Sequence, residues 1–305
     1  MRMPLPLKIL SVLVLPLLAA IVPAAAADIA IPVQDADPAL HALLPDAVRA
    51  SGRITLVTDA HALPCEAFDD ARQTIVGFEP DVIRAVTQKL GVGVEMTSTD
   101  FPGVIPGLQS ARYDMAMSCL TDRPDREESM TFIDYWMGVA AIYTLESDTS
   151  VTEDPLTLCG LRTAAQSGIS YIDMINNLLS VHCEKNGKPR IELSELPSRA
   201  AVLLALYAGR IDFALSDTAA AADLKAKAPK PVRMVANRFL PRSYTGFAVR
   251  KDDTALAAAL QAGLKAIYEN GTYDLIAKKW QLEPLKLEAP GINLATAQPF
   301  DNPKP

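Results

Sequence analysis

The sequence predicts an α/β fold with two lobes, each a mostly parallel sheet flanked by helices, and a cleft between them. Strand-length apolar segments alternate with segments of helical periodicity, which is typical of parallel sheets covered by helices. The phrase SARYDMAMSC at residues 110–119 returns as AGRIDFALSD at residues 208–217. Each copy reads as a helix end, a tight turn and a buried strand. We interpret them as one copy per lobe; the alternative is that unrelated helix–turn–strand units have converged.

The first 27 residues have the pattern of a secretory signal peptide. Two basic residues, Arg2 and Lys8, accompany a mostly apolar run over residues 9–22, and three alanines at 25–27 offer a cleavage site before Asp28. An uncleaved membrane anchor is the alternative, but the run is short for a span of about 20 residues. We therefore expect export to the periplasm with cleavage near Ala27.

The elements of the first lobe follow in order. Residues 28–52 carry an irregular start and then a helix that stops near Gly52. Strands are expected over residues 53–58, 92–97 and 113–118, a loop from 59 to 77, and helices over 80–90 and 104–111.

The second lobe repeats the same alternation. Strands are expected over residues 161–165, 191–193 and 211–216, and helices over 170–179 and 199–208. The chain then returns through a strand at 245–250 and helices at 255–269 and 273–279. Lobe 1 thus comprises residues 53–140 and 246–282, and lobe 2 comprises 141–245, with hinge crossings at both ends. Residues 283–305 read as an extended or disordered proline-rich tail.

Composition points to a small solute as the partner. The formal net charge is −7, and removal of Arg2 and Lys8 makes it more negative, which argues against nucleic acid and anionic membranes. The four cysteines would enter an oxidising compartment. Cys159 and Cys183 flank one strand and helix and can close a loop worth roughly 3 kcal/mol; Cys65 and Cys119 are a possible second bridge. No metal-ligand spacing involves the three histidines.

Charged residues follow the two repeated strands. Ligands of parallel sheets bind beyond the carboxyl ends of strands. Asp217 comes directly after one strand, and Arg126 ends the stretch that follows the other. A guanidinium on one lobe and a carboxylate on the other suit a zwitterion such as an α-amino acid.

In these segments the chain resembles the periplasmic solute-binding proteins of polar amino-acid ABC importers, extracellular solute-binding protein family 3. The resemblance covers residues 38–283 and rests on segments in order: LLPDAVRASGRITLVTD, VGFEPDVIRAV, FPGVIPGLQSARYDMAMS, TDRPDRE followed by FIDYW, LCGLRTAAQSGIS, YAGRIDFALSD, and TGFAVRKDD followed by ENGTYDLIAKKW. It implies the two-lobed periplasmic-binding-protein fold, lobe closure on an amino acid, a membrane permease as partner, a monomer, no cofactor and no catalytic residue.

The resemblance also implies roles for single residues. Arg126 would grip the ligand carboxylate with Thr121 beside it, and Asp217 would take the α-ammonium. Other matched positions are the aromatic wall Phe101, the loop Gly168, Ile169 and Ser170, whose free amides would favour an anion, and also Cys119 and Asp59. This chain departs from the family pattern at Ala62, Cys65, Cys119 and Arg123. The residues usual at these positions would indicate which ligand side chain is preferred, so that indication is lost here.

Other interpretations remain open at this stage. Arg126 can be a solvated helix residue, Asp217, Thr121 and Ser170 can be helix caps, and Phe101 can be core. The same fold carries dehydratases of prephenate-like acids, for which Glu66 is the candidate acid. A receptor sensor domain would need a membrane span after Trp280, and none follows.

Overall fold

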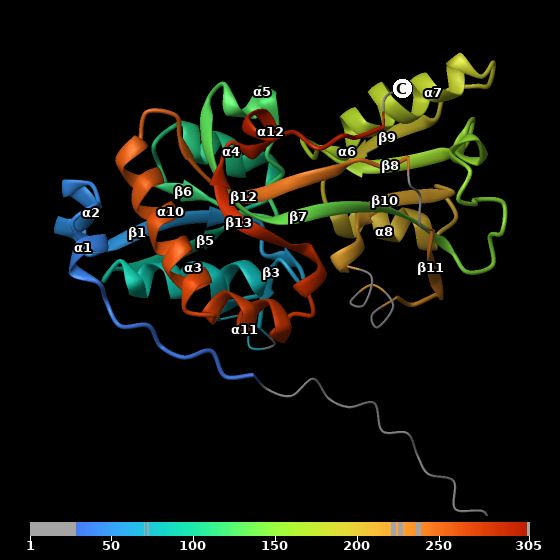
Figure 1. The fold of residues 1–305 in the computed structure, drawn as a ribbon. Helices are drawn as coiled ribbons and strands as arrows, with labels where there is room; N and C mark the ends of the chain where they lie inside the picture. The colour runs from blue at the N-terminus through green and yellow to red at the C-terminus, as the bar shows by residue number, and fades with distance from the viewer. Residues whose placement is uncertain are drawn as a thin grey trace, which may run out of the picture.

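The computed structural model describes residues 29–69, 71, 73–220, 224, 228–235 and 239–303. The predicted signal peptide, residues 1–27, lies outside them. Two lobes lie side by side and are joined by the long strands β7 (Met130–Leu145) and β12 (Arg242–Arg250) (Figure 1). This mixed α/β, two-lobed architecture confirms the predicted fold class. Of the described helices, none is both long and apolar enough to cross a membrane.

The first lobe has the strand order β5-β1-β6-β12-β7, with β13 added on β7. β1 pairs in parallel with β5 and β6, whereas β12 runs antiparallel to its neighbours. The elements are α1 (Pro38–His41), α2 (Asp46–Ser51), β1 (Arg53–Thr58), β2 (His61–Ala62), β3 (Glu66–Phe68), β4 (Ile75–Val76), α3 (Phe78–Lys89), β5 (Gly93–Ser98), α4 (Phe101–Gln109), β6 (Met115–Ala116), α5 (Pro124–Glu127), α10 (Thr254–Glu269) and α11 (Thr272–Lys279).

The second lobe has the order β7-β10-β8-β9, with β11 also on β7. β8 pairs in parallel with β9 and β10. The elements are the 3₁₀ helix η1 (Pro155–Leu158), β8 (Arg162–Gln166), α6 (Tyr171–Asp173), the π-helical η2 (Met174–Leu179), α7 (Ser180–Lys185), β9 (Glu192–Leu196), α8 (Arg199–Tyr207), β10 (Phe213–Asp217), the 3₁₀ helix η3 (Thr218–Ala220) and β11 (Val232–Val235).

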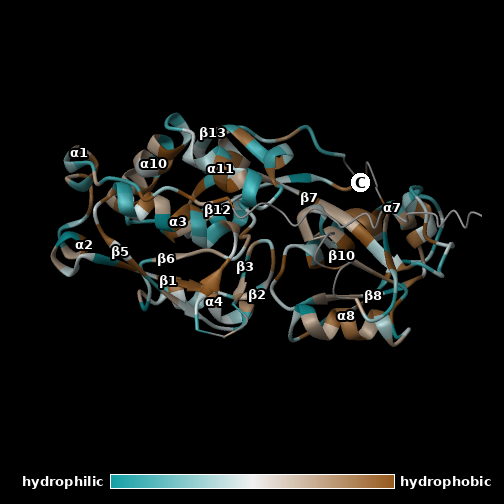
Figure 2. Cartoon of the chain, turned by 90° about the horizontal axis from the view of Figure 1, so that it is seen from below, coloured by the Kyte–Doolittle hydropathy of each residue, from teal (hydrophilic) through white to brown (hydrophobic). Residues whose placement is uncertain are grey.

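Each lobe has its own apolar core (Figure 2). In the first, Phe78 of α3 packs with the rings of Tyr135 and Trp136 from β7. In the second, Phe213 of β10 and Ile175 are fully buried. Burial of apolar surface against the sheets therefore stabilises the lobes separately, and the crossing strands are shared between them.

The repeated phrase has the same structure in both lobes. Ala111 and Gly209 turn the chain at φ 58° and 68°, a left-handed conformation that glycine adopts without strain. Asp114 then accepts a hydrogen bond from the backbone N–H of Thr55, and Asp212 accepts one from the N–H of Arg162, both at 2.8 Å. Each aspartate thus ties its strand to the first strand of its lobe.

Several expected elements differ in extent. The single helix expected before Gly52 is two short helices, because Pro45 lacks an N–H and precedes α2. The expected loop at 59–77 contains a small antiparallel sheet of β2, β3 and β4. The strand expected at 113–118 forms only two residues of β6.

The tail at 283–305, expected to be extended or disordered, is ordered in the described part of the chain. The disordered alternative was wrong, whereas residues 286–292 form an extended strand. A 3₁₀ helix η4 (Glu283–Leu285), strand β13 (Lys286–Ile292) and helix α12 (Leu294–Ala297) follow α11. β13 pairs antiparallel with β7, and the chain then runs along β12 toward the second lobe (Figure 1). We call residues 293–303 the C-terminal strap. Its proline-rich sequence has no local periodicity, and its partners are distant in sequence, from 54 residues away for Tyr244 to 173 for Asp122.

Candidate functional site

A cavity of about 660 Å³ lies between the lobes. Its walls come from loops of both lobes, from the crossing strands β7 and β12, and from the C-terminal strap. Of the nine predicted ligand residues, eight line it: Arg126, Asp217, Thr121, Phe101, Ile169, Ser170, Cys119 and Asp59. The ninth, Gly168, contributes its carbonyl oxygen to Arg126. Positions far apart in the sequence therefore converge on one site.

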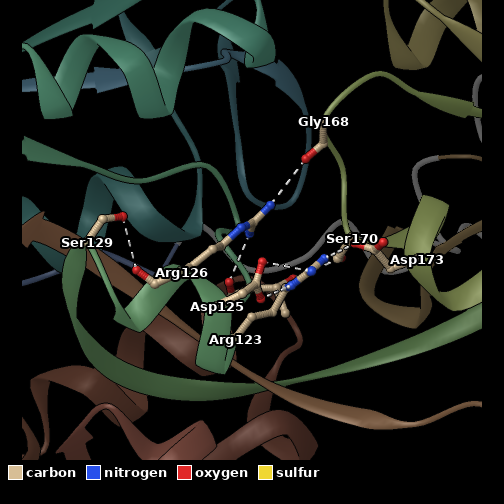
Figure 3. Close-up of polar contacts among 8 residues, drawn as sticks. Arg123, Asp125, Arg126, Ser129, Gly168, Ser170 and Asp173 are labelled. Atoms are coloured by element: carbon tan, nitrogen blue, oxygen red, sulfur yellow. Dashed lines mark hydrogen bonds and ion pairs between the residues drawn. The ribbon is translucent and has the colours of Figure 1, made fainter. Parts of the chain in front are cut away.

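Arg126 lies on the short helix α5, which begins at Pro124, and is only 8% exposed. Its Nη1 donates to the carbonyl of Thr121 at 2.9 Å, and its Nη2 donates to the carbonyl of Gly168 on the other lobe at 3.2 Å (Figure 3). Burial, followed by the charge of Arg123, lowers the pKa of Arg126 to about 10. The guanidinium remains charged at neutral pH and is suited to a carboxylate.

Asp217 ends β10 on the second lobe. Its Oδ1 accepts from the backbone N–H of Ala219 at 2.9 Å. Burial raises the pKa of Asp217 to about 6, although the Ala219 N–H and the charge of Arg199 oppose this shift. The group is ionised at pH 7 but close to its midpoint, so a cation beside it would stabilise the carboxylate.

Gly138 on β7 leaves room beside Asp217. A Cβ at this position would lie 3.4 Å from Oδ2 of Asp217, 2.7 Å from the Ser243 hydroxyl and 3.1 Å from the Thr245 hydroxyl. These three oxygens therefore converge on one point at the crossing strands. An ammonium group has three donors and suits such a set of acceptors.

Among the residues that the structure describes, four side-chain hydrogen bonds or ion pairs bridge the lobes around the cavity. Besides the contact of Arg126 with Gly168, the Thr121 hydroxyl lies 3.3 Å from that of Ser170, and Gln166 Nε2 donates to Asp59 at 3.1 Å. Arg123 Nη1 pairs with Asp173 Oδ2 at 2.5 Å (Figure 3). The structure therefore has the lobes in contact around the cavity.

The loop at Gly168 differs in detail from the expected anion site. The N–H of Ile169 donates to the carbonyl of Gln166, so it is not free. Gly168 has φ +81°, and a Cβ there would meet the ring of Phe101 at 3.8 Å. The loop therefore approaches Phe101 closely and presents the carbonyl of Gly168 to Arg126.

Both cysteine pairs form disulfides, Cys65–Cys119 and Cys159–Cys183. The first lies at the cavity wall, where both cysteines contribute to the lining. Cys119 N–H donates to Glu79 at 2.7 Å, which ties this wall to helix α3. The bridge thus fixes two loops of the first lobe next to the site.

Comparison with known proteins decides the family. Residues 54–283 match the model of the bacterial extracellular solute-binding proteins, family 3. The chain belongs to this family. It is 27% identical over 263 residues to the arginine-binding protein ArgT of Corynebacterium glutamicum, covering 86% of this chain and 84% of the relative. It is 26% identical over 246 residues to the lysine/arginine/ornithine-binding periplasmic protein of Escherichia coli, covering 79% and 89%.

Solved structures agree with this family assignment. An ancestral arginine-binding protein bound to arginine superposes with a TM-score of 0.66 at 27% identity, covering 75% of this chain and 98% of that one. An ancestral amino-acid-binding protein, described as a precursor of cyclohexadienyl dehydratase, gives 0.63 at 26% identity, covering 77% and 98%.

In this solute-binding protein, Glu66 belongs to a buried acid pair. It is 1% exposed, accepts from the Ser118 hydroxyl at 2.9 Å and lies against Glu79. Burial, and next the charge of Glu79, raise the pKa of Glu66 well above its ordinary value. The named relatives are binding proteins rather than enzymes, which supports a receptor without catalytic residues over a dehydratase.

Sequence reasoning missed several cavity residues of this solute-binding protein. Arg199 and Tyr171 line the cavity from the second lobe, and Ser243 lines it from β12. Phe300 and Asn302 come from the C-terminal strap, beyond the family match. Ser243 could have been found from the strand periodicity around it. No local sequence pattern marks the other four residues as lining a cavity.

Proposed function

We propose that this protein is the receptor of an amino-acid ABC importer. It is exported by its signal peptide, captures an L-α-amino acid or a derivative in the periplasm as a monomer, and delivers it to a membrane permease. Membership of the family supports this role, as do relatives named as arginine-, lysine- and cystine-binding proteins. No cofactor is required, because the proposed activity is ligand binding without a chemical reaction.

The observation that carries the proposal is the pair Arg126 and Asp217. They line one cavity from opposite lobes, and in the described part of the chain neither has an oppositely charged side chain within 4.0 Å. Groups of opposite charge that line a cavity without a direct ion pair favour a ligand that supplies both charged partners. An α-amino acid does so, with its carboxylate on Arg126 and its ammonium on Asp217.

Other residues take supporting roles in this proposal. Thr121 and Ser170 would share the ligand carboxylate, and Phe101 would pack against the side chain. Ile169 and Cys119 would complete the walls, and Gly168 and Asp59 would hold the lobes together around the ligand. Because Arg126 and Asp217 belong to different lobes, the closed form alone satisfies both ends of a zwitterion.

A thermal-shift screen tests the proposal. The oxidised mature protein is unfolded and refolded to remove carried ligand, then tested against the common L-amino acids, cystine, opines, polyamines and prephenate. We expect stabilisation by an amino acid that is lost in Arg126→Ala and in Asp217→Ala. The exposed Arg112→Ala and Asp252→Ala variants should retain it. Stabilisation by prephenate alone, unaffected in Asp217→Ala, would contradict the proposal.

A further inference from the structure

The cavity contains more guanidinium groups than one α-carboxylate requires. Among the residues that the structure describes, four arginines line it: Arg123, Arg126, Arg199 and Arg242. Arg123 pairs with Asp125 and Asp173, and the Arg242 guanidinium lies 4.8 Å from the ring centre of Phe300. Arg126 and Arg199 have no carboxylate within 4.0 Å among the residues described. Their hydrogen bonds go to neutral oxygens instead, backbone carbonyls for Arg126 and the Ser216 hydroxyl for Arg199.

Arg199 is held at the cavity by the start of helix α8. Ser198 caps the helix by accepting from the N–H of Ala201 at 3.2 Å, so Arg199 is its first residue. Arg199 Nη2 donates to the hydroxyl of Ser216, which is 7% exposed and directly precedes Asp217. The side chain is thus anchored by a neutral hydroxyl beside the proposed ammonium site.

Most acids at the cavity are already engaged. Asp59 accepts from the N–H of Phe101 at 3.2 Å and from Gln166 at 3.1 Å, and it also contacts His61. Asp173 pairs with Arg123, and Asp122 accepts from the N–H of Ala295 at 2.9 Å.

Of the other acids at the cavity, Glu66 accepts from the Ser118 hydroxyl at 2.9 Å, and Asp100 is exposed at the start of α4. Asp217 receives backbone N–H groups but no cationic side chain within 4.0 Å in the described chain. The charge of Arg199 acts on Asp217 from beyond that distance, so a ligand carboxylate would give Arg199 the direct anionic partner that it lacks.

We propose that Arg199 binds a second carboxylate of the ligand, so that the substrate is an α-amino acid carrying an additional acid group. This inference rests on the proposed function: Arg126 takes the α-carboxylate, Asp217 the ammonium and Arg199 the further carboxylate. A charge-assisted bond from a guanidinium distinguishes an acid from its amide. The cavity of about 660 Å³ has room for such a side chain. The specificity would differ from that named for the arginine-binding relatives.

Isothermal titration calorimetry on refolded protein tests the inference with four probes: L-glutamate, L-2-aminoadipate, L-glutamine and L-arginine. Glutamate and glutamine have nearly the same shape and differ in charge. We expect one of the two acids to bind at least about tenfold more tightly than glutamine and arginine. In Arg199→Gln the acid and glutamine should bind with about the same Kd. The Kd of glutamine itself should stay within about threefold of its wild-type value. Arg199→Met is a second variant, and the exposed Arg210→Gln is the matched control that keeps the preference.

The outcomes separate the inference from the proposed function. Tighter binding of glutamine or arginine by the wild type, or an acid preference that survives in Arg199→Gln and Arg199→Met, overturns the role of Arg199 and leaves the zwitterion site standing. Binding that is unaffected by Arg126→Ala and Asp217→Ala overturns the proposed function itself. Binding of none of the four probes overturns the inferred ligand class.

Discussion

At the scale of single residues, burial shifts the pKa values of Arg126 and Asp217 in opposite directions. Desolvation lowers the pKa of Arg126 and raises that of Asp217, because it disfavours the charged form of each group. Both remain charged at pH 7, but this pH is only about one unit above the pKa of Asp217. Binding of the ammonium should therefore depend on pH in a way that binding of the carboxylate does not.

We expect affinity to fall as the pH falls through about 6. The ligand ammonium binds the carboxylate form of Asp217, which is dominant at pH 7.5 and about a tenth populated at pH 5, so Kd should rise about tenfold. Burial, and next the charge of Asp217, raise the pKa values of the neighbouring Tyr143 and Tyr171 above their ordinary value, so both stay neutral over this range. Calorimetry at pH 5, 6 and 7.5 measures the change. Asp217→Asn should bind weakly with a flat profile; a flat profile in the wild type would contradict the account.

Sequence reasoning predicted Arg126 and Asp217 as ligand residues because Asp217 directly follows one repeated strand, Arg126 ends the stretch after the other, and strand ends of a parallel sheet meet at one edge. It did not identify Arg199, because the start of a helix gives no indication of whether a side chain points to solvent or into a cleft. The direction is set by the hydroxyl of Ser216, and this contact exists only in the folded chain.

At the scale of elements, the C-terminal strap connects the site to the rest of the first lobe. The backbone N–H groups of residues 294, 295 and 296 donate to Asp134, Asp122 and Glu127 at 2.9–3.0 Å. Further along, Phe300 stacks on Tyr244 with ring centres 4.2 Å apart, and Asn302 makes two hydrogen bonds with the backbone of Arg242. Tyr244 lies between Ser243 and Thr245, which line the cavity. The strap therefore supports one of the two strands that join the lobes.

A chain ending at Ile292 should be less stable by about 2–4 kcal/mol, since it leaves three buried carboxyl groups without their N–H donors. Urea unfolding measures the difference, and a chain ending at Pro303, which keeps these contacts of residues 294–302, is the control. Equal free energies of unfolding for all three chains would contradict a structural role for the strap.

The same cluster gives the strap a pH dependence. Burial raises the pKa of Asp122 to about 6, and burial together with the charge of Asp122 raises that of Asp134 well above its ordinary value. Acids with raised pKa values contribute stability at low pH that is lost as the pH rises through the folded values. The N–H groups of the strap act in the opposite sense, because those of Ala295 and Leu294 lower the pKa values of Asp122 and Asp134 and so stabilise the ionised carboxylates. The destabilisation caused by truncation at Ile292 should therefore be larger at pH 8 than at pH 5.5.

Local periodicity predicted most helices and strands of both lobes, since the apolar residues of each buried face recur at a regular spacing along the sequence. It did not predict β7 as one strand of sixteen residues or the pairing of β13 with it. Those features depend on partners distant in sequence, and a proline-rich segment gives no sign of where it will pair.

At the scale of the whole molecule, the lobes share β7 and β12 and otherwise meet through a few side chains. The Arg123–Asp173 pair is partly exposed, and pairs of this kind stabilise by only about 0.2–1 kcal/mol. We therefore expect the free protein to open in solution and the ligand to favour the closed form. Small-angle X-ray scattering should show a smaller radius of gyration with saturating ligand, and no change with the same ligand in Arg126→Ala. An unchanged radius in the wild type would contradict closure.

The most direct test of the zwitterion site measures the binding of each ligand derivative to each protein variant. Calorimetry would compare the bound amino acid with its α-carboxamide and its N-acetyl form on the wild type, Arg126→Ala and Asp217→Ala. We expect both derivatives to bind the wild type more weakly, by about 2–5 kcal/mol. The carboxamide penalty should largely disappear in Arg126→Ala, and the N-acetyl penalty in Asp217→Ala, because each pair forms a single interaction. Penalties that stay the same in both variants would show that Arg126 and Asp217 do not hold the two ends of the ligand.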